Sequence, residues 1–359
     1  IMVNDDGTLG EPNDLKVVSV KHKMGINASP TCTMSFGDEG GATGWLLGNE
    51  FDGMRVMFVM MNMARLSVGV QGLGLAERTL QGALSYANER VQGKVVGTPK
   101  EDRTSPIVGH PDVRRMLLDM RSLTEAMRGI CLMNAVAMDR AGSLADEDAR
   151  QAAEDLNELL IPITKAWCTD MGVEVTSLAI QVYGGMGFVE ETGVSQFFRD
   201  ARIAPIYEGT NGIQAMDLVG RKLPMRSGGV VTDTIADIRA TAAALSADDE
   251  LAGIGARLAE ATDALDEATQ WIFGHAGEIR DVLAGATPYL RMWGLVVGGW
   301  VLGKSALAAA EWAADDGPAD FCAEKVRTAR WFADQHLSTV VGLTARATSG
   351  ASLMDEASL

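Results

Sequence analysis

The spacing of apolar residues changes near Gly53, and this change sets the fold class that the chain can adopt. Before it, apolar and β-branched residues alternate over 15–20 and 31–36, between turns rich in Gly and Asp, as they do in short strands. After it, apolar residues recur about every 3.6 positions, which is the period of an amphipathic helix. The sequence therefore predicts a short β segment followed by a chain that is almost entirely α-helical.

Glycine and proline divide the helical part of the chain. A loop rich in Gly, Pro and Ser over 93–109 separates the first long helix from one that begins at Pro111, because proline is favoured at the first helical position. Residues 223–229 form a candidate linker. We predict helices over 53–90, 111–140, 147–183, 194–201, 209–222, 231–246, 248–284, 287–315 and 317–347, and a frayed tail over 348–359. The expected parts of the chain are thus 1–50, 51–223 and 230–350.

The charge balance and the cysteines limit the class of partner. The 359 residues include 31 Lys and Arg against 48 Asp and Glu, a net charge of −17, which disfavours nucleic acid binding because such binding neutralises phosphates. The four cysteines are scattered without metal-ligand spacing, which suits a reduced, cytoplasmic setting and predicts no metal site. Gly, Asn or Arg interrupts the apolar stretches well short of the ~20 residues of a membrane span, so we expect no membrane partner.

The most specific stretch of the sequence lies between Gln181 and Thr210. It contains Gln181-Val182-Tyr183-Gly184-Gly185-Met186-Gly187-Phe188, then Arg199-Asp200-Ala201, then Tyr207-Glu208-Gly209-Thr210. Taken singly, Glu208 is an ordinary glutamate ahead of a helix, and the paired glycines end a helix in a left-handed conformation. Taken together and in this order, the three motifs resemble the C-terminal part of the acyl-CoA dehydrogenase family.

This resemblance implies a fold and a reaction. The fold is mainly α: the family's C-terminal helical bundle, preceded by a remnant of its middle β domain and followed by an additional helical domain. The family uses FAD to oxidise an acyl-CoA thioester to the trans-2-enoyl-CoA, and Glu208 matches the base that removes the α-proton while the β-hydrogen leaves as hydride to flavin N5. Such a base needs an apolar, water-excluded site, and hydrogen bonds must stabilise the enolate oxygen. In the family, the backbone N–H of this glutamate is one of those donors.

The resemblance also assigns binding residues. Cofactor contacts are expected from Arg90, Gln92, Gln181, Gly184, Gly185 and Thr210, and substrate contacts from Arg65, Asn62, Tyr207 and Gly209. Arg90 suits a flavin diphosphate because its planar fork matches phosphate oxygens, while the alternative is a solvated cation near the C-terminus of a helix. The chain departs from the family at Gly212, where many members have a flavin-contacting Gln.

Two further features of the first long helix have alternative explanations. A dense group of methionines either fills the core or lines a flexible acyl channel; its members are Met54, Met57, Met60, Met61 and Met63. The glycines at 69, 72 and 74 superficially match a nucleotide-binding loop, but they have the wrong order and follow no strand. We therefore expect these glycines to allow close helix packing.

Within the family, the helical extension and the sequence around Glu208 resemble those of a large bacterial subgroup that includes 3-methylmercaptopropionyl-CoA dehydrogenases. This implies a sulfur-containing or short- to medium-chain acyl-CoA substrate, an electron-transfer flavoprotein as acceptor, and a homodimer or homotetramer, because the family's flavin site spans subunits. The first residues lie in mid-strand, so we expect the natural start of the chain upstream. The alternatives are an acyl-CoA oxidase, a DNA-protecting flavoprotein of the same fold, and a fragment that is inactive by itself.

Overall fold

The structure is a computed structural model that describes residues 2–97 and 105–358, without the side chains of residues 58 and 59. The chain forms two compact units, Ile1–Asn62 and Met63–Leu359, and the boundary falls within the first long helix. The loop predicted over 93–109 lies partly outside the described residues.

The first unit contains a small antiparallel sheet. Strand β1 (Leu15–Val20) pairs with β2 (Cys32–Phe36), with Leu15 opposite Phe36 and a register irregularity between Val17 and Ser19. Most side chains of both strands are exposed, and a hairpin of two strands is too small to build a core of its own. The predicted short β segment is confirmed.

Helices make up the second unit. Their bounds are α1 (Gly53–Glu89), η1 (Ile107–Gly109), α2 (Pro111–Ser143), α3 (Glu147–Tyr183), η2 (Gly184–Phe188), η3 (Glu190–Thr192), α4 (Val194–Ala201), α5 (Asn211–Asp217), η4 (Leu218–Lys222), η5 (Met225–Gly228), α6 (Gly229–Ser246), α7 (Ala252–Gly274), α8 (Ile279–Ala314), α9 (Ala319–Gln335), η6 (Leu337–Thr339), α10 (Val341–Ala347) and α11 (Ser352–Glu356). The mainly α fold class is confirmed.

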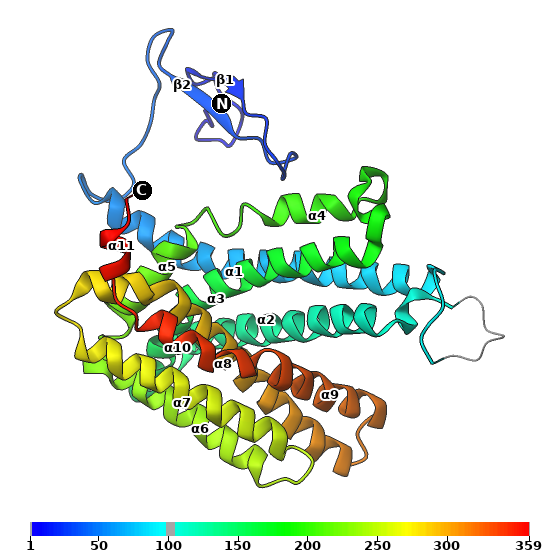
Figure 1. Ribbon diagram of the computed structural model, residues 1–359. Coiled ribbons are helices and arrows are strands. Elements are labelled where there is room, and N and C mark those ends of the chain that lie inside the picture. The colour runs from blue at the N-terminus through cyan, green and yellow to red at the C-terminus, as the bar shows by residue number, and fades with distance from the viewer. Residues whose placement is uncertain (1, 98–104, 359) are drawn as a thin grey trace. The chain divides into compact units, whose positions relative to one another are not determined.

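The helical unit has two layers around one core (Figure 1). In this view α2 and α3 run side by side, and α6, α7 and α9 lie in a layer below them. Helix α8 is central, since it contacts α2, α3, α5, α6, α7, α9 and α10. Its Trp293 and Trp300 are buried, as expected for helix-packing anchors, whereas Trp312 near its end is half-exposed.

Glycines bring α1 against α3. A Cβ added at Gly72 would lie 2.6 Å from the carbonyl oxygen of Cys168, and one at Gly69 would lie 2.8 Å from Thr164 Cγ2. Gly172 faces Gly72 in turn, where a Cβ would lie 2.9 Å from the Gly72 carbonyl oxygen. The prediction that these glycines serve close packing is confirmed for Gly69 and Gly72, whereas Gly74 faces open space.

Some predicted helix ends are wrong, and tertiary packing explains the difference. The break expected between 284 and 287 lies instead at 275–278, because α8 continues through Pro288. An interior proline costs ~3 kcal/mol, and here the buried neighbours Tyr289 and Trp293 outweigh that cost. The helix expected over 317–347 turns at Leu337, which is buried against Gly299.

The two segments expected to lack regular structure also differ from the prediction. Residues 223–229 include the short helix η5, which is fixed to α3 by an ion pair between Arg226 and Asp155 at 2.7 Å. The C-terminal tail includes α11, and the Ala351 N–H just before it donates to Asp281 at 2.6 Å. Side-chain contacts from distant parts of the chain thus order both segments.

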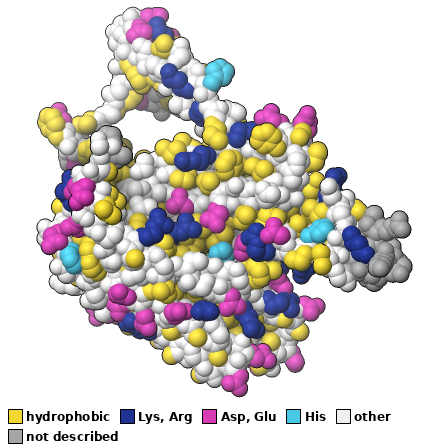
Figure 2. All heavy atoms as spheres, in the orientation of Figure 1, with side chains coloured by type: hydrophobic (Ala, Val, Ile, Leu, Met, Phe, Trp, Pro, Cys, Tyr) yellow, Lys and Arg dark blue, Asp and Glu magenta, His cyan; other side chains and the backbone are white. Residues whose placement is uncertain are grey.

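Surface charge and apolar helix length bear on possible partners. Figure 2 shows acidic and basic side chains interspersed over the face that it displays. Helices α1 and α8 are each long and apolar enough to span a membrane by length and composition alone. The most apolar window of α8 is 78% buried inside the protein, as in a core helix, and that of α1 is 31% buried.

Candidate active site

Glu208 lies in a tight loop between α4 and α5. Its backbone φ of 56° is left-handed, and Gly209 after it has φ of 81°. A left-handed conformation is uncommon for a residue with a Cβ, and it persists only where surrounding contacts enforce it. Thr210 then caps α5, because its Oγ1 accepts the Ile213 N–H at 3.3 Å.

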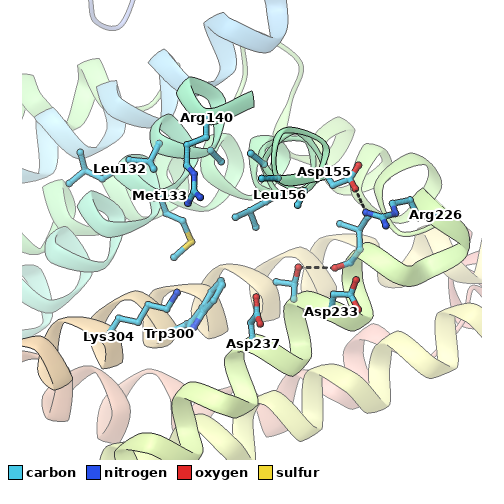
Figure 3. Close-up of a pocket in the computed structure, with 17 residues that line it drawn as sticks. Leu132, Met133, Arg140, Asp155, Leu156, Arg226, Asp233, Asp237, Trp300 and Lys304 are labelled. Carbon is cyan, nitrogen blue, oxygen red and sulfur yellow. Dashed lines mark hydrogen bonds and ion pairs between the residues drawn. The ribbon is translucent and has the colours of Figure 1, made fainter. Parts of the chain in front are cut away.

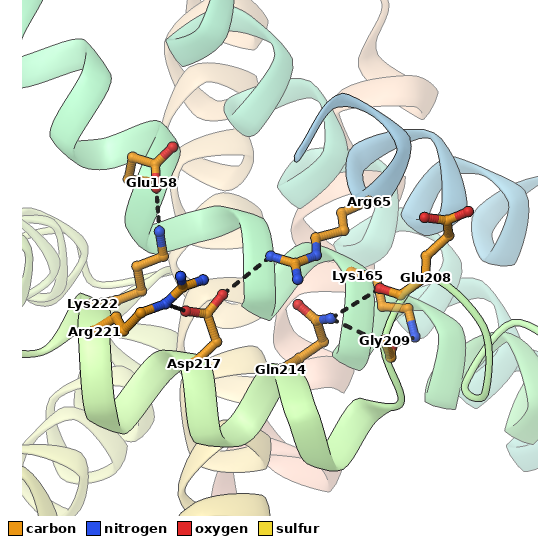
Figure 4. A network of polar contacts seen from close by, with 9 residues as sticks. All are labelled: Arg65, Glu158, Lys165, Glu208, Gly209, Gln214, Asp217, Arg221 and Lys222. Atoms are coloured by element: carbon orange, nitrogen blue, oxygen red, sulfur yellow. Dashed lines mark hydrogen bonds and ion pairs between the residues drawn. The ribbon is translucent and has the colours of Figure 1, made fainter. Parts of the chain in front are cut away.

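Two fully buried side chains hold the backbone of this loop. Lys165 of α3 donates to the Gly209 carbonyl and to Asn211 Oδ1, each at 2.8 Å. Gln214 of α5 donates to the Glu208 carbonyl at 3.2 Å and to the Gly209 carbonyl at 3.4 Å. Figure 4 shows the two bonds of Gln214, with the half-buried Glu208 side chain pointing away from Gln214.

Arg65 was expected to bind substrate, and the structure gives it a protein partner. Its Nη1 lies 3.1 Å from Asp217 Oδ2, and both side chains are less than 5% exposed (3% and 4%). Asp217 also pairs with Arg221, whose side chain is largely exposed. A charge pair at this depth must be closely bonded, because each ion has lost its water. We call Arg65, Lys165, Glu208, Gln214 and Asp217 the loop cluster (Figure 4).

Burial perturbs the titration of two groups beside the base. It lowers the pKa of Lys165 to about 8 from its ordinary 10.5; the charge of Arg65 lowers it as well, while Asp170 and Glu208 oppose the shift. Burial also raises the pKa of Tyr207, whose hydroxyl donates to Gln71 of α1. Tyr207, expected to touch substrate, therefore has a hydrogen bond within the protein.

Four of the predicted cofactor residues line a pocket at the C-terminal ends of α1 and α3, separate from the loop cluster. Arg90, Gln92, Gly184 and Gly185 lie around a cavity of about 540 Å³, which we call the Arg90 pocket. Sequence reasoning missed the lining residues Tyr86 and His110, which lie outside the motifs, and Tyr183, which lies inside one but was assigned no contact. The Tyr86 and Tyr183 rings stack with centroids 4.1 Å apart, and His110 Nε2 lies 2.9 Å from the Gln92 carbonyl oxygen.

The Arg90 pocket is open to a phosphorylated ligand. Arg90 is exposed, and its Nη2 donates to Gln92 Oε1 at 3.1 Å. Gly184 caps α3 with φ of 61°, and a Cβ at Gly184 or Gly185 would meet no atom within 4 Å. A ligand can therefore approach the backbone here, as glycine permits. These residues fit the diphosphate part of a flavin dinucleotide.

The remaining predicted residues lie outside this pocket. Gln181 is exposed on the last turn of α3 and is not among the pocket-lining residues, and Thr210 lies in the Glu208 loop. Asn62 lies on α1, three positions before Arg65. Of the nearby methionines, Met54, Met60 and Met63 are 58–65% exposed, so core filling is wrong for these three.

A larger cavity lies elsewhere in the helical unit. It has a volume of about 680 Å³ and is lined by residues of α2, α3, α6 and α8 with Arg226. Figure 3 shows Arg140, Lys304 and Asp237 at its sides, and the Asp155–Arg226 ion pair near one end. None of the predicted site residues lines it.

Comparison with known proteins identifies the class. Residues 52–223 match the family described as acyl-CoA dehydrogenase, C-terminal domain, and 234–356 match a family described as acetyl-CoA dehydrogenase C-terminal like. The chain belongs to the acyl-CoA dehydrogenase family.

Among curated proteins, the chain is 46% identical over 340 residues to 3-methylmercaptopropionyl-CoA dehydrogenase of Ruegeria pomeroyi, covering 94% of this chain and 57% of that protein. It is 34% identical to a butyryl-CoA dehydrogenase of Syntrophomonas wolfei, covering 92% and 55% respectively. The chain thus spans little more than half the length of these relatives.

Solved structures support the fold. An acyl-CoA dehydrogenase complexed with FAD from Bacillus anthracis superposes with a TM-score of 0.73 at 20% identity, over 93% of this chain and 56% of that one. Caenorhabditis elegans ACDH-11 in complex with C11-CoA superposes with a TM-score of 0.74 at 20% identity, over 93% of this chain and 52% of that one. At this identity the likeness concerns the fold alone.

Proposed function

We propose that the chain is the catalytic C-terminal part of an FAD-dependent acyl-CoA dehydrogenase in which Glu208 removes the α-proton of the substrate thioester. The observation that carries this proposal is the left-handed backbone of Glu208, held by Lys165 and Gln214. Strained residues of this kind concentrate at functional sites. The loop presents a carboxylate on one side while its carbonyls are bonded on the other.

The loop supplies what α-proton abstraction needs from the protein. The Glu208 side chain is half-buried, so water is partly excluded from the base. Its backbone N–H would donate to the thioester oxygen, as the family resemblance implies, and the fixed loop would hold that donor in place. Gly209 and Tyr207 flank the base and are proposed to contact the thioester, and the family resemblance adds Asn62 and Arg65 of α1 as proposed substrate contacts.

The Arg90 pocket is the proposed cofactor site. Arg90 and Gln92 would hold the flavin diphosphate, Gly184 and Gly185 would let it approach the backbone, and Gln181 and Thr210 would make outer contacts. The resemblance implies that this flavin is bound mainly by the neighbouring subunit, and FAD would supply the acceptor for the β-hydride. Because the family's flavin contacts cross subunits, we propose a homodimer or homotetramer.

The substrate proposal follows the most similar curated protein cited above. At 46% identity over 94% of the chain, 3-methylmercaptopropionyl-CoA is the first candidate, with short- and medium-chain acyl-CoAs next. We further propose an electron-transfer flavoprotein as acceptor and a cytoplasmic location, without nucleic acid or membrane as partner.

The test is anaerobic bleaching of the flavin in the FAD-loaded enzyme by 3-methylmercaptopropionyl-CoA and by butyryl-CoA. Glu208→Gln should keep the flavin and abolish bleaching, because the amide cannot take the proton. Glu191→Gln is the matched control, since Glu191 is an exposed glutamate upstream of the loop, and it should bleach like the parent. Undiminished bleaching of the Glu208 variant would refute the proposal.

The same preparation separates the alternatives. Reoxidation by air at turnover speed would indicate an oxidase, and a salt-dependent gel shift with DNA would indicate a DNA-binding role. A purified chain that takes up no flavin would indicate an inactive fragment.

A further inference from the structure

We propose that Lys165 is a positioning residue for the reaction: it fixes the Glu208 loop so that the carboxylate and the backbone N–H of Glu208 face the substrate. This inference rests on the proposed role of Glu208 as the base. Lys165 lies outside the motifs that predicted the site, and it acts through the loop rather than on the reacting atoms.

The contacts of Lys165 join the loop to the middle of α3. Its ammonium donates to the Gly209 carbonyl, one residue after the base, and to Asn211 Oδ1, three residues after it. Asn211 is bound to the same helix by its amide, which donates to the Ala166 carbonyl at 3.1 Å, Thr169 Oγ1 at 3.0 Å and Asp170 Oδ1 at 2.7 Å. The loop is thus tied to more than one turn of α3, from Lys165 to Asp170.

The burial of Lys165 indicates a role that an apolar residue would not fill. Its side chain is fully buried, although a buried ammonium loses much of its hydration energy. Both of its described hydrogen bonds go to neutral oxygens of the loop rather than to a carboxylate. The buried charge therefore serves to hold the loop backbone rather than to pair with a carboxylate.

The conformation of Glu208 shows what these bonds enforce. With φ of 56°, its backbone is in a region that a residue with a Cβ rarely occupies. Lys165 holds the carbonyl of the next peptide, so that the loop cannot relax to negative φ without breaking a buried, charge-assisted hydrogen bond. Relaxation would turn the carboxylate away from the position that the loop now gives it.

This arrangement predicts an effect on the chemical step rather than on substrate affinity. In the FAD-loaded enzyme, stopped-flow measurement of flavin reduction by butyryl-CoA gives the limiting rate and the substrate dissociation constant separately. Lys165→Met should lower the limiting rate about 100-fold, the loss typical of a small misplacement of a reacting group, with the dissociation constant within about threefold of the parent.

Lys222→Met is the matched control. Lys222 is also buried, at 7% exposed, but it bonds Glu158 and makes no described contact with the loop. The same substitution there should lower stability and leave the limiting rate within about twofold of the parent. A merely structural role of Lys165 would give the same result at both positions.

Two further variants keep the outcome decisive. Glu208→Gln, measured alongside, tests the base: full activity of that variant would refute the proposed function. Loss of activity in Glu208→Gln with a parental rate in Lys165→Met would overturn the positioning role alone. If Lys165→Met does not fold, Asn211→Ser takes its place, because it removes the second acceptor of Lys165. An about 10-fold slower rate supports the inference, and a parental rate overturns it.

Discussion

The loop cluster and the Arg90 pocket both include residues of α1 and α3 and differ in how their charges are satisfied. In the loop cluster, Arg65 and Lys165 are buried and are bonded to Asp217 and to loop oxygens. In the Arg90 pocket, Arg90 is exposed and its described partner is the neighbouring Gln92 side chain. The cations of the first region are bonded within the protein, whereas Arg90 of the second exposes its charge to solvent.

This difference indicates that the two regions have different tasks: the loop cluster positions the base, and the Arg90 pocket binds the cofactor. A base must be aimed before the substrate arrives, so the protein itself fixes its surroundings. A dinucleotide site can leave its cation solvated, because the ligand brings the opposite charge. Substitutions should therefore change folding stability at the loop cluster and ligand affinity at the Arg90 pocket.

The largest expected effect comes from breaking the buried ion pair of the loop cluster. Asp217→Ala removes the carboxylate that lies 3.1 Å from Arg65, and loss of one partner of such a buried pair costs about 3–5 kcal/mol of unfolding free energy. Denaturant unfolding followed by circular dichroism measures it. Glu260→Ala removes an exposed pair with Arg257 and should cost less than about 1 kcal/mol. Equal losses in the two variants would contradict the distinction between the regions.

The pH dependence of stability tests the burial of Lys165. Its folded pKa of about 8 lies below the ordinary 10.5, so between these values the unfolded chain binds more protons than the folded one. Unfolding free energy should therefore rise with pH over this window, by up to about 3 kcal/mol, and this group should add no further pH dependence below pH 8 or above 10.5.

Lys165→Met isolates that contribution, because other lysines and tyrosines titrate in the same range. The groups acting on the Lys165 charge are Asp170 on α3, Arg65 on α1 and Glu208 in the loop. The parent should gain stability with pH relative to the variant. Parallel curves would show that Lys165 has an ordinary pKa.

The Arg90 pocket should respond to substitution through affinity. Arg90→Ala removes an exposed guanidinium, so folding stability should change little, while the flavin dissociation constant rises about 10- to 100-fold. Arg90→Lys keeps the positive charge but lacks the planar fork of donors. Its flavin dissociation constant should therefore lie between those of the parent and of Arg90→Ala. Fluorescence titration with FAD measures both, and Arg257→Ala controls for loss of a surface cation. An unchanged constant in Arg90→Ala would remove this residue from the cofactor site.

The sequence predicted one region better than the other for a physical reason. The Arg90 pocket is built at the C-terminal ends of α1 and α3; its glycines stand in a recognisable motif, and its arginine stands where the family resemblance implies a flavin contact. The loop cluster depends on pairs far apart in sequence, such as Arg65 with Asp217 and Lys165 with Gly209. Periodicity places Lys165 on a helix but does not indicate which side chain or carbonyl it meets.

The fold shows the same limit. Helix positions up to Tyr183 followed from periodicity and from Pro111, which lies at the first position of α2. The end of α7 at Gly274 and the start of α8 at Ile279 could not be predicted in this way. Pro288 indicated a helix break, but the buried face of α8 stabilises a continuous helix through it. Local signals predict an element where packing agrees with them.

The smallest expected effect concerns the contact between α1 and α3 that holds both regions on one scaffold. Gly72 leaves no room for a Cβ beside the Cys168 carbonyl, so Gly72→Ala should lower unfolding free energy by about 1–3 kcal/mol. Gly74, half a turn away on the same helix, faces open space, and Gly74→Ala should be neutral or stabilising by up to about 1 kcal/mol. Thermal unfolding of the two variants compares them directly. Because the contact lies between Arg65 and Arg90 along α1, Gly72→Ala should also weaken flavin binding and slow flavin reduction together, whereas a variant in either region alone changes one of them.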